Sequence, residues 1–289
     1  MAKYIDTKEA AAITGWTMSG VNHFCRSGKI DCHKDDLGRW KISKSSLESF
    51  LVNRKPNKHT NKENLAERIE KDKRDKIVRI SPGNTKLGKI PSFNLLPLKT
   101  CAGSTALCRK YCYARQSLQY SCQANKAWTV NTYMVNKHLD AVEHTISHWL
   151  TKRKPVLFRI HAAGDFVSQE YLDMWQRIAG KFTETRFLAF TKHFTLDYTE
   201  KPDNLVVMYS VFPDSDYDSI PADGNKLSFA VFPADMPDKH YDPTVDKQIT
   251  DQRLTLPCPG DCRGCGVCWH IDRLDVNVMF KIHGSIRRK

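Results

Sequence analysis

The sequence predicts an α/β protein in which a small winged helix-turn-helix domain precedes a partial (β/α) barrel-like domain with cysteine-rich loops. Three observations predict this fold. Residues 4–51 read as two short helices, a hairpin and a third helix. Apolar, strand-like segments alternate with helical ones from residue 92 onward, and seven of the ten cysteines stand in two short loops.

Length and composition limit the class of protein. The chain has 289 residues, enough for about two domains. It has no apolar run near the roughly 18 residues of a membrane span and no signal-peptide pattern in Met1–Gly15, so we expect a cytoplasmic protein without a membrane partner. In such a chain, ten cysteines favour metal ligands or redox chemistry over disulfides. A net charge of +13 and a pI near 9.2 favour nucleic acid as partner over a merely soluble basic protein.

The first domain, residues 1–53, is expected to bind double-stranded DNA. Thr7 is expected to cap a first helix, Met18–Arg26 has the apolar spacing of a second, Ile30–Ile42 reads as a hairpin, and a last helix starts at Ser43. In such an arrangement the second helix enters the major groove and the hairpin forms a basic wing. The expected DNA contacts are Ser19, Asn22, His23, Arg26, Lys29, Arg39 and Lys41.

Three short motifs in this domain match a known superfamily. They are T-K-E-A-A before the first turn, R-S-G-K-I after the second helix and G-R-W-K-I in the wing. With them, residues 4–51 resemble the excisionase branch of the MerR-like superfamily, which implies DNA binding. The alternative is a platform for protein contacts, because residues 1–53 carry 8 Lys/Arg against 6 Asp/Glu. A module this small makes few phosphate contacts, so we expect a homodimer or added contacts from the following segment.

Residues 54–77 read as a basic helical linker. Arg54–His59 is polar and contains Pro56, whereas Asn61–Lys76 is rich in Glu, Lys and Arg at helical spacing. We expect a solvated helix between the domains.

The second domain, residues 78–289, alternates strands and helices. The expected helices are Ala124–Leu150 and Ser168–Ala179, and the expected strands are Ser92–Leu96, Val156–Ala162, Arg186–Thr191, Leu205–Phe212, Leu227–Phe232 and Val276–His283. Chemistry in barrel-like α/β domains gathers at the carboxyl ends of the strands. Each chemically distinctive segment of this domain follows such a strand, so we expect these segments to share one rim.

Two sets of cysteines have the spacing of metal ligands. Cys101, Cys108 and Cys112 stand in one Gly-containing loop, and Cys258, Cys262, Cys265 and Cys268 stand in another. Four thiolates so close together favour a [4Fe–4S] cluster, with zinc at Cys258–Cys268 as the alternative. The first set lacks a fourth ligand, which leaves an open iron or completion by Cys122, His161 or a late cysteine. Disulfides or plain core packing are the remaining interpretation.

The motif C-Y-A-R, at Cys112–Arg115, follows closely spaced cysteines and resembles the cluster loop of radical S-adenosylmethionine enzymes, especially the spore photoproduct lyase branch. This resemblance implies an iron–sulfur cluster and S-adenosylmethionine, with Gly164 and Asp165 at the methionyl amine and Lys192 in a matching T-K pair. The spacing C-x6-C-x3-C departs from the C-x3-C-x2-C of that superfamily.

Residues 80–289 also resemble the phage gene product 88-like family. The likeness rests on C-x6-C-x3-C-Y-A, on the H-x-x-G-D-F strand end at His161–Phe166 and on the late cysteines. It implies an architecture, with no established reaction. The expected cofactor contacts are therefore Gly164, Asp165, His161 and Lys192.

Three functions fit these patterns. The first is a transcriptional regulator of a phage or mobile element whose DNA binding is coupled to an iron–sulfur domain. The second is a radical S-adenosylmethionine-type enzyme that acts on or is recruited to nucleic acid. The third is an excisionase-like architectural recombination factor with structural clusters.

Overall fold

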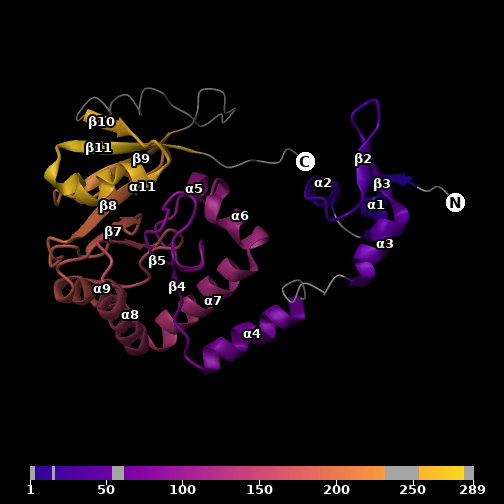
Figure 1. Cartoon of the computed structure of the whole chain (residues 1–289). Helices are drawn as coiled ribbons and strands as arrows, with labels where there is room; N and C mark the ends of the chain where they lie inside the picture. Colours follow the sequence, from indigo (N-terminus) through magenta and orange to yellow (C-terminus); the bar gives the residue numbers. More distant parts are fainter. Residues whose placement is uncertain (1–3, 15–16, 54–61, 232–253, 283–289) are drawn as a thin grey trace. The chain divides into compact units, whose positions relative to one another are not determined.

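The computed structural model describes residues 4–14, 17–53, 62–231 and 254–282, and it divides the chain into two compact units, Met1–Thr60 and Asn61–Lys289 (Figure 1). Among these described residues, none of the helices has the length and apolar character needed to cross a membrane.

The first unit combines three helices with a small antiparallel sheet. The helices are α1 (Thr7–Thr14), α2 (Met18–Arg26) and α3 (Lys44–Asn53), and the strands are β1 (Tyr4–Asp6), β2 (Cys32–Lys34) and β3 (Trp40–Ser43). Strand β3 pairs with β1 on one side and with β2 on the other. The expected helices and hairpin are present. Strand β1 was not predicted, because three residues are too few to show an alternating pattern.

Capping side chains fix where the first two helices begin. Asp6 Oδ1 accepts a hydrogen bond from Glu9 N at 2.8 Å, and Glu9 Oε2 accepts one from Asp6 N at 3.0 Å. This reciprocal pair makes Asp6 the cap of α1, so the expectation that Thr7 caps it was wrong. Thr17 caps α2 by accepting from Gly20 N at 3.1 Å.

Apolar residues at helical and strand spacing fill the core of this unit. Its buried members are Ile5, Ala10, Val21, Cys25, Ile30, Ile42 and Leu47. Cys25 has the core position that its spacing predicts. Burial, together with a hydrogen bond to Cys32, raises the pKa of its thiol to about 12.

The second unit is built around one large sheet. Its helices are α4 (Lys62–Arg74), α5 (Ala106–Lys110), α6 (Tyr113–Tyr120), α7 (Cys122–Lys137), α8 (Leu139–Arg153), α9 (Gln169–Lys181) and α11 (Cys262–Cys265), with 3-10 turns η1 (Tyr217–Ser219) and η2 (Val267–Arg273). Its strands are β4 (Ile80–Ser81), β5 (Ser92–Phe93), β6 (Leu157–Ile160), β7 (Arg186–Thr191), β8 (Leu205–Val211), β9 (Lys226–Val231), β10 (Leu254–Pro257) and β11 (Val276–Lys281).

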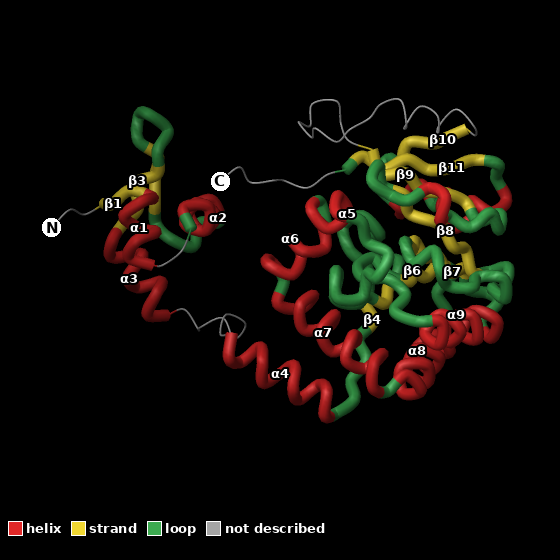
Figure 2. Tube along the Cα trace, turned by 180° about the vertical axis from the view of Figure 1, so that it is seen from behind, coloured by secondary structure: helices red, strands yellow, loops and turns green. Residues whose placement is uncertain are grey.

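The eight strands lie in the order β10-β11-β9-β8-β7-β6-β5-β4. Every neighbouring pair is parallel except β4 and β5, which are antiparallel. Strands β5 to β9 are therefore neighbours in the order of the chain, as expected from the alternation of strands and helices. Helices α7, α8 and α9 lie along one side of this sheet in both views (Figures 1 and 2).

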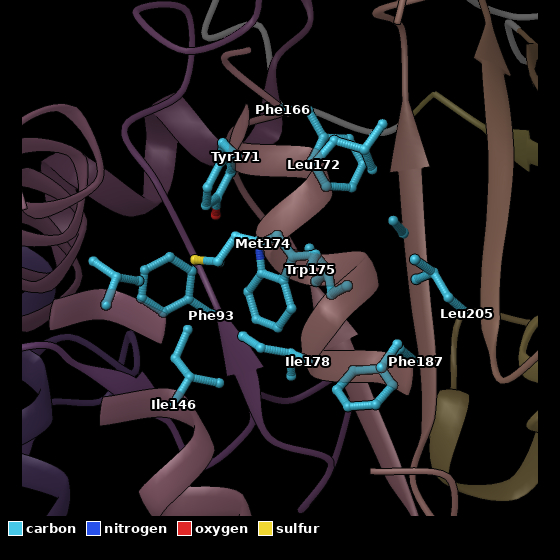
Figure 3. Packing of buried hydrophobic residues seen from close by; sticks show 14 of the residues in the cluster. Phe93, Ile146, Phe166, Tyr171, Leu172, Met174, Trp175, Ile178, Phe187 and Leu205 are labelled. Carbon is cyan, nitrogen blue, oxygen red and sulfur yellow. The ribbon is translucent and has the colours of Figure 1, made fainter. Parts of the chain in front are cut away.

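The sheet is buried on both faces, as a parallel sheet requires. Phe158, Phe187 and Leu205 face the core formed with α7, α8 and α9, in which Trp175 packs among Phe93, Ile178 and Phe187 (Figure 3). The alternate residues face a second core. It contains Leu188, Val206, Met208, Trp269, Ile271 and Val278, so η2 covers the face opposite the helices.

Besides the short elements that were not predicted, three differences from expectation change how this unit packs. The helix predicted over 124–150 is two helices, because His138 leaves the helical conformation at φ −147°. The break lets α7 bury Val130 and Met134 while α8 buries Ile146 and Leu150. The strand β10 was missed because it ends in Pro257, a residue that an edge strand tolerates.

The third difference is the charged helix α4, which belongs to the second unit and packs against α7. Asp72 on α4 is only 6% exposed and forms ion pairs with Arg79 at 2.5 Å and Lys126 at 3.0 Å. This part of the expected linker is therefore docked through a buried charge and is not a fully solvated helix. Residues 54–61 lie outside the described part of the chain.

Candidate functional site

The loops that carry the expected cofactor residues leave one edge of the sheet. Cys101 lies in the loop after β5, Asp165 in the loop after β6, and Lys192 directly after β7. Because these strands are parallel neighbours, their carboxyl ends meet at the same edge. The structure thus brings together three segments that are up to 91 positions apart in the chain, from Cys101 to Lys192.

The first thiol group consists of Cys101, Cys108 and Cys112. Thr105 accepts a hydrogen bond from Cys108 N at 3.1 Å and so caps α5, while Cys112 stands at the start of α6. Burial, together with the nearby charges of Asp165 and Cys108, raises the pKa of Cys101 to about 11. Burial also raises the pKa of Cys108. The charge of Lys192 lowers this pKa, and that of Cys112 raises it. The three thiols are therefore electrostatic neighbours of one another.

A glycine sets how closely this loop approaches β7. A Cβ atom on Gly103 would lie 1.8 Å from the carbonyl oxygen of Lys192, which no side chain could tolerate. Gly164, at φ +89°, is equally constrained, since a Cβ would lie 2.6 Å from Leu95 Cβ and 2.9 Å from Thr100 Oγ1. The loops after β5, β6 and β7 are thus in backbone contact.

Asp165 and Lys192 connect two of these strand ends. The buried Asp165 accepts hydrogen bonds from Phe166 N and Lys192 N, each at 2.8 Å. Burial raises the pKa of this carboxyl group in spite of those hydrogen bonds. The Lys192 ammonium donates to Ser210 Oγ at 2.9 Å, at the end of β8, and lowers the pKa of Cys108. Lys192 thus places a positive charge beside this thiol group.

His161 points into the core. Its backbone has φ +58°, its side chain is 3% exposed, and Nε2 lies 2.8 Å from the Tyr171 hydroxyl oxygen. Its Nδ1 has no hydrogen-bond partner among the described residues. Burial, and then the charge of Arg159, lower its pKa to about 3. Of the expected cofactor residues, His161 is therefore held neutral and inward, whereas Gly164, Asp165 and Lys192 lie beside the thiols.

The second thiol group consists of Cys258, Cys262, Cys265 and Cys268. It runs from the end of β10 through α11 into η2, and Cys262 N donates to Lys86 O at 2.9 Å. Trp269 secures the segment to the sheet through Nε1, which donates to Phe158 O at 3.2 Å. Burial raises the pKa of Cys268 to about 12, and Arg159 opposes this increase.

Arg159 and Tyr113 connect the two thiol groups. The guanidinium of Arg159 interacts electrostatically with Tyr113 and with Cys258, Cys262 and Cys268. The Tyr113 hydroxyl donates to the carbonyl oxygen of Ala162 and interacts in turn with the three thiols of the first group. The Tyr113 ring is 53% exposed while its hydroxyl is directed inward.

Arg159 and Asn94 were not predicted as site residues, and Tyr113 was known only as part of the C-Y-A-R motif. Asn94 Oδ1 accepts from Ala162 N at 2.7 Å and Ala163 N at 3.3 Å, and so fixes the loop after β6. The available signal was a charged residue inside an otherwise apolar strand, since Arg159 interrupts Val156–Ile160. A buried charge there needs a partner.

The donor chemistry suits metals that bind sulfur. All ten cysteines are free thiols, so the disulfide interpretation was wrong. Among the described residues, no group of three His, Cys, Asp or Glu side chains could hold a single metal ion. Four thiolates on one zinc would lie about 3.8 Å apart, given Zn–S bonds near 2.3 Å. An iron–sulfur cluster is larger than an ion and would separate its thiolate ligands further.

The expected DNA-binding residues lie on α2 and the β2–β3 hairpin. Ser19, His23, Arg26 and Lys29 are exposed, while Val21 and Cys25 of the same helix are buried. Asn22 is half-buried and accepts a hydrogen bond from Thr7 at 3.4 Å. In the hairpin, Asp35 pairs with Arg39 at 3.0 Å and with Lys41 at 3.8 Å, which orders these two basic side chains.

Comparison with known proteins assigns most of the chain to one family. A family model described as Gene product 88 matches residues 52–271. Gene 88 protein of Mycobacterium phage D29 is 29% identical over 129 residues, which cover 40% of this chain and 53% of that protein. Gene 88 protein of Mycobacterium phage L5 is 27% identical over 129 residues, covering 40% and 54% respectively. The chain thus spans about half the length of these curated relatives.

Replacing His161 tests whether it is held neutral. An unfolded histidine has a pKa near 6.5, so acid protonates the unfolded chain before it protonates the buried side chain, whose pKa is about 3. The free energy of unfolding should therefore fall as the pH drops below 6.5, and His161 should contribute about 2.5 kcal/mol of that fall by pH 4.5. We expect His161→Asn, which tolerates the positive φ, to remove this contribution in chemical denaturation between pH 7 and 4.5. Exposed His148→Asn is the control; equal pH slopes in all three proteins would contradict the prediction.

Proposed function

The chain belongs to the Gene product 88 family, and from this premise we propose that it is a phage-associated, DNA-binding iron–sulfur protein whose second unit regulates the first. The observation that carries the proposal is the gathering of seven free thiols into two groups beside the carboxyl ends of parallel strands. The partly buried thiols Cys101 and Cys268 keep raised pKa values in spite of the nearby Lys192 and Arg159, and a bound metal centre would add the positive charge that favours their thiolates.

In this proposal Cys101, Cys108 and Cys112 hold one cluster, and Cys258, Cys262, Cys265 and Cys268 hold the other. Such clusters supply one-electron chemistry and respond to oxidants. Lys192 beside the first group and Arg159 beside the second stabilise thiolate charge. Zinc at the second group is the alternative.

DNA binding is assigned to the first unit, as a winged helix-turn-helix. Its support is the exposed polar face of α2, with Arg26 in the last turn, and the ordered basic hairpin. Loss of a cluster would change the packing of the second unit and with it the geometry of a dimer on two half-sites.

A second candidate is an S-adenosylmethionine-dependent enzyme on a partial (β/α) barrel. The observation that favours it is the position of Gly164 and Asp165, next to a thiol group with only three cysteines. Asp165 accepts two backbone hydrogen bonds and stands where a cationic amine would gain from a carboxylate. The consecutive order of β5 to β9 supports the barrel.

Metal analysis tests the proposal. We expect protein purified without oxygen to contain iron and acid-labile sulfide. Cys108→Ser should remove the iron bound by the first thiol group, and Cys262→Ser the iron bound by the second, because each substitution removes one thiolate from its group. Cys32→Ser, which changes a thiol of the first unit, is the matched control. A chain with neither iron, sulfide nor zinc would refute the metal assignment.

DNA binding is tested at two arginines. Arg26→Ala should weaken binding to the specific DNA site by about 1–3 kcal/mol. Arg39→Ala should lower the affinity for all sequences and reduce the slope of log affinity against log salt concentration by about 1. Gel shifts on phage genomic fragments at several salt concentrations measure both. Affinities unchanged in both variants would remove the groove assignment.

The enzyme candidate makes its own prediction. Reduced, cluster-loaded protein should release 5′-deoxyadenosine from S-adenosylmethionine, and Asp165→Asn should slow the release while iron content stays constant. If no product forms although iron is present, the enzyme candidate is refuted and the proposal of a regulator remains.

A further inference from the structure

Negative charge is absent from one long segment of the chain. Lys76–Leu139 covers 64 residues without a single Asp or Glu, whereas the whole chain has 32 among 289. At that density about seven would be expected in a segment of this length. The same segment contains ten Lys and Arg. By contrast, residues 140–231 carry 13 acidic and 10 basic side chains.

Part of this positive charge is neutralised from outside the segment. Arg79 and Lys126 pair with Asp72 of α4. Asp214, after β8, accepts a hydrogen bond from Leu107 N at 2.8 Å, at the start of α5. At the other end of α5 and on α6, Arg109, Lys110 and Arg115 are exposed. Within the described residues, neither Arg109 nor Arg115 forms an ion pair with a carboxylate, and both instead donate to backbone carbonyl oxygens.

Two exposed tyrosines accompany these charges. Tyr113 and Tyr120 begin and end α6 and are 53% and 72% exposed. Seven residues apart, they lie on the same face of the helix, about 10 Å apart along its axis. The hydrogen bond from the Tyr113 hydroxyl to Ala162 O fixes that ring while leaving one part of it in solvent. Exposed aromatic rings among basic side chains are what single-stranded nucleic acid binds, through base stacking and phosphate contacts.

We propose that α5 and α6 form a binding surface for single-stranded nucleic acid, directly beside the first thiol group. Arg109, Lys110 and Arg115 contact phosphates, and Tyr113 and Tyr120 stack on bases. Helices α5 and α6 follow one another at one side of the second unit in both views (Figures 1 and 2), so the surface is continuous along the chain. It is separate from the duplex-binding face proposed for α2 and does not depend on a metal.

The test uses the full chain and a fluorescein-labelled oligo(dT) of about 20 nucleotides, long enough for one site. We expect the triple variant Arg109→Gln/Lys110→Gln/Arg115→Gln to bind at least about tenfold more weakly. The slope of log affinity against log salt concentration should fall by about 2 in magnitude, since each lost phosphate contact contributes about 0.7. The matched control is Lys152→Gln/Arg153→Gln, which removes exposed charges from the end of α8. Fluorescence anisotropy across a salt series gives both quantities.

Substitutions at Tyr120 distinguish base stacking from phosphate contacts. Tyr120→Ala should weaken oligo(dT) binding with an unchanged salt slope, while Tyr120→Phe keeps the ring and the affinity. A triple variant that binds like the control overturns the proposal, as does a surface that binds anionic phosphatidylglycerol vesicles but no oligonucleotide. Iron measured on each preparation reports separately on the metal proposal.

Discussion

The parallel pairing of β5, β6 and β7 is the constraint on which the second unit depends. It places three loops at one edge of the sheet, and backbone contacts then hold them there. Gly103 packs against the Lys192 carbonyl, Gly164 packs against Leu95, and the Asn94 side chain bridges to the loop after β6. Neither glycine contact leaves room for an added Cβ. The position of the first thiol group follows from them.

The two thiol groups have similar electrostatic environments. Burial raises the pKa of Cys101 and Cys108 in the first group and of Cys262 and Cys268 in the second, and each group has a cation nearby, Lys192 for the first and Arg159 for the second. Arg159 also interacts with Tyr113, which itself interacts with the first group. A change of charge at one group would therefore alter the electrostatic potential at the other through Arg159, which lies on β6.

Charge is distributed unevenly over the second unit. The segment that forms α5, α6 and α7 has no carboxylate of its own, and two of its cations, Arg79 and Lys126, are paired with Asp72 of α4. That pairing docks α4, whereas Arg109, Lys110 and Arg115 remain exposed on α5 and α6. Stability and surface charge are thus supplied by different residues of the same segment.

Local patterns in the sequence determined much of this fold. Alternation of apolar residues was enough for β7 and β8, helical spacing for α2 and α9, and cysteine spacing for the two thiol groups, because these signals lie within a few residues of one another. Elements without such signals were missed: the short β1 and β4, and β10 with its proline. The tertiary structure alone decided which side chains meet. It turned His161 toward Tyr171, docked α4 through Asp72 and placed Arg159 and Tyr113 between the thiols. Those contacts join residues far apart in the chain, and burial, which sets their energies, exists only once the sheet has formed.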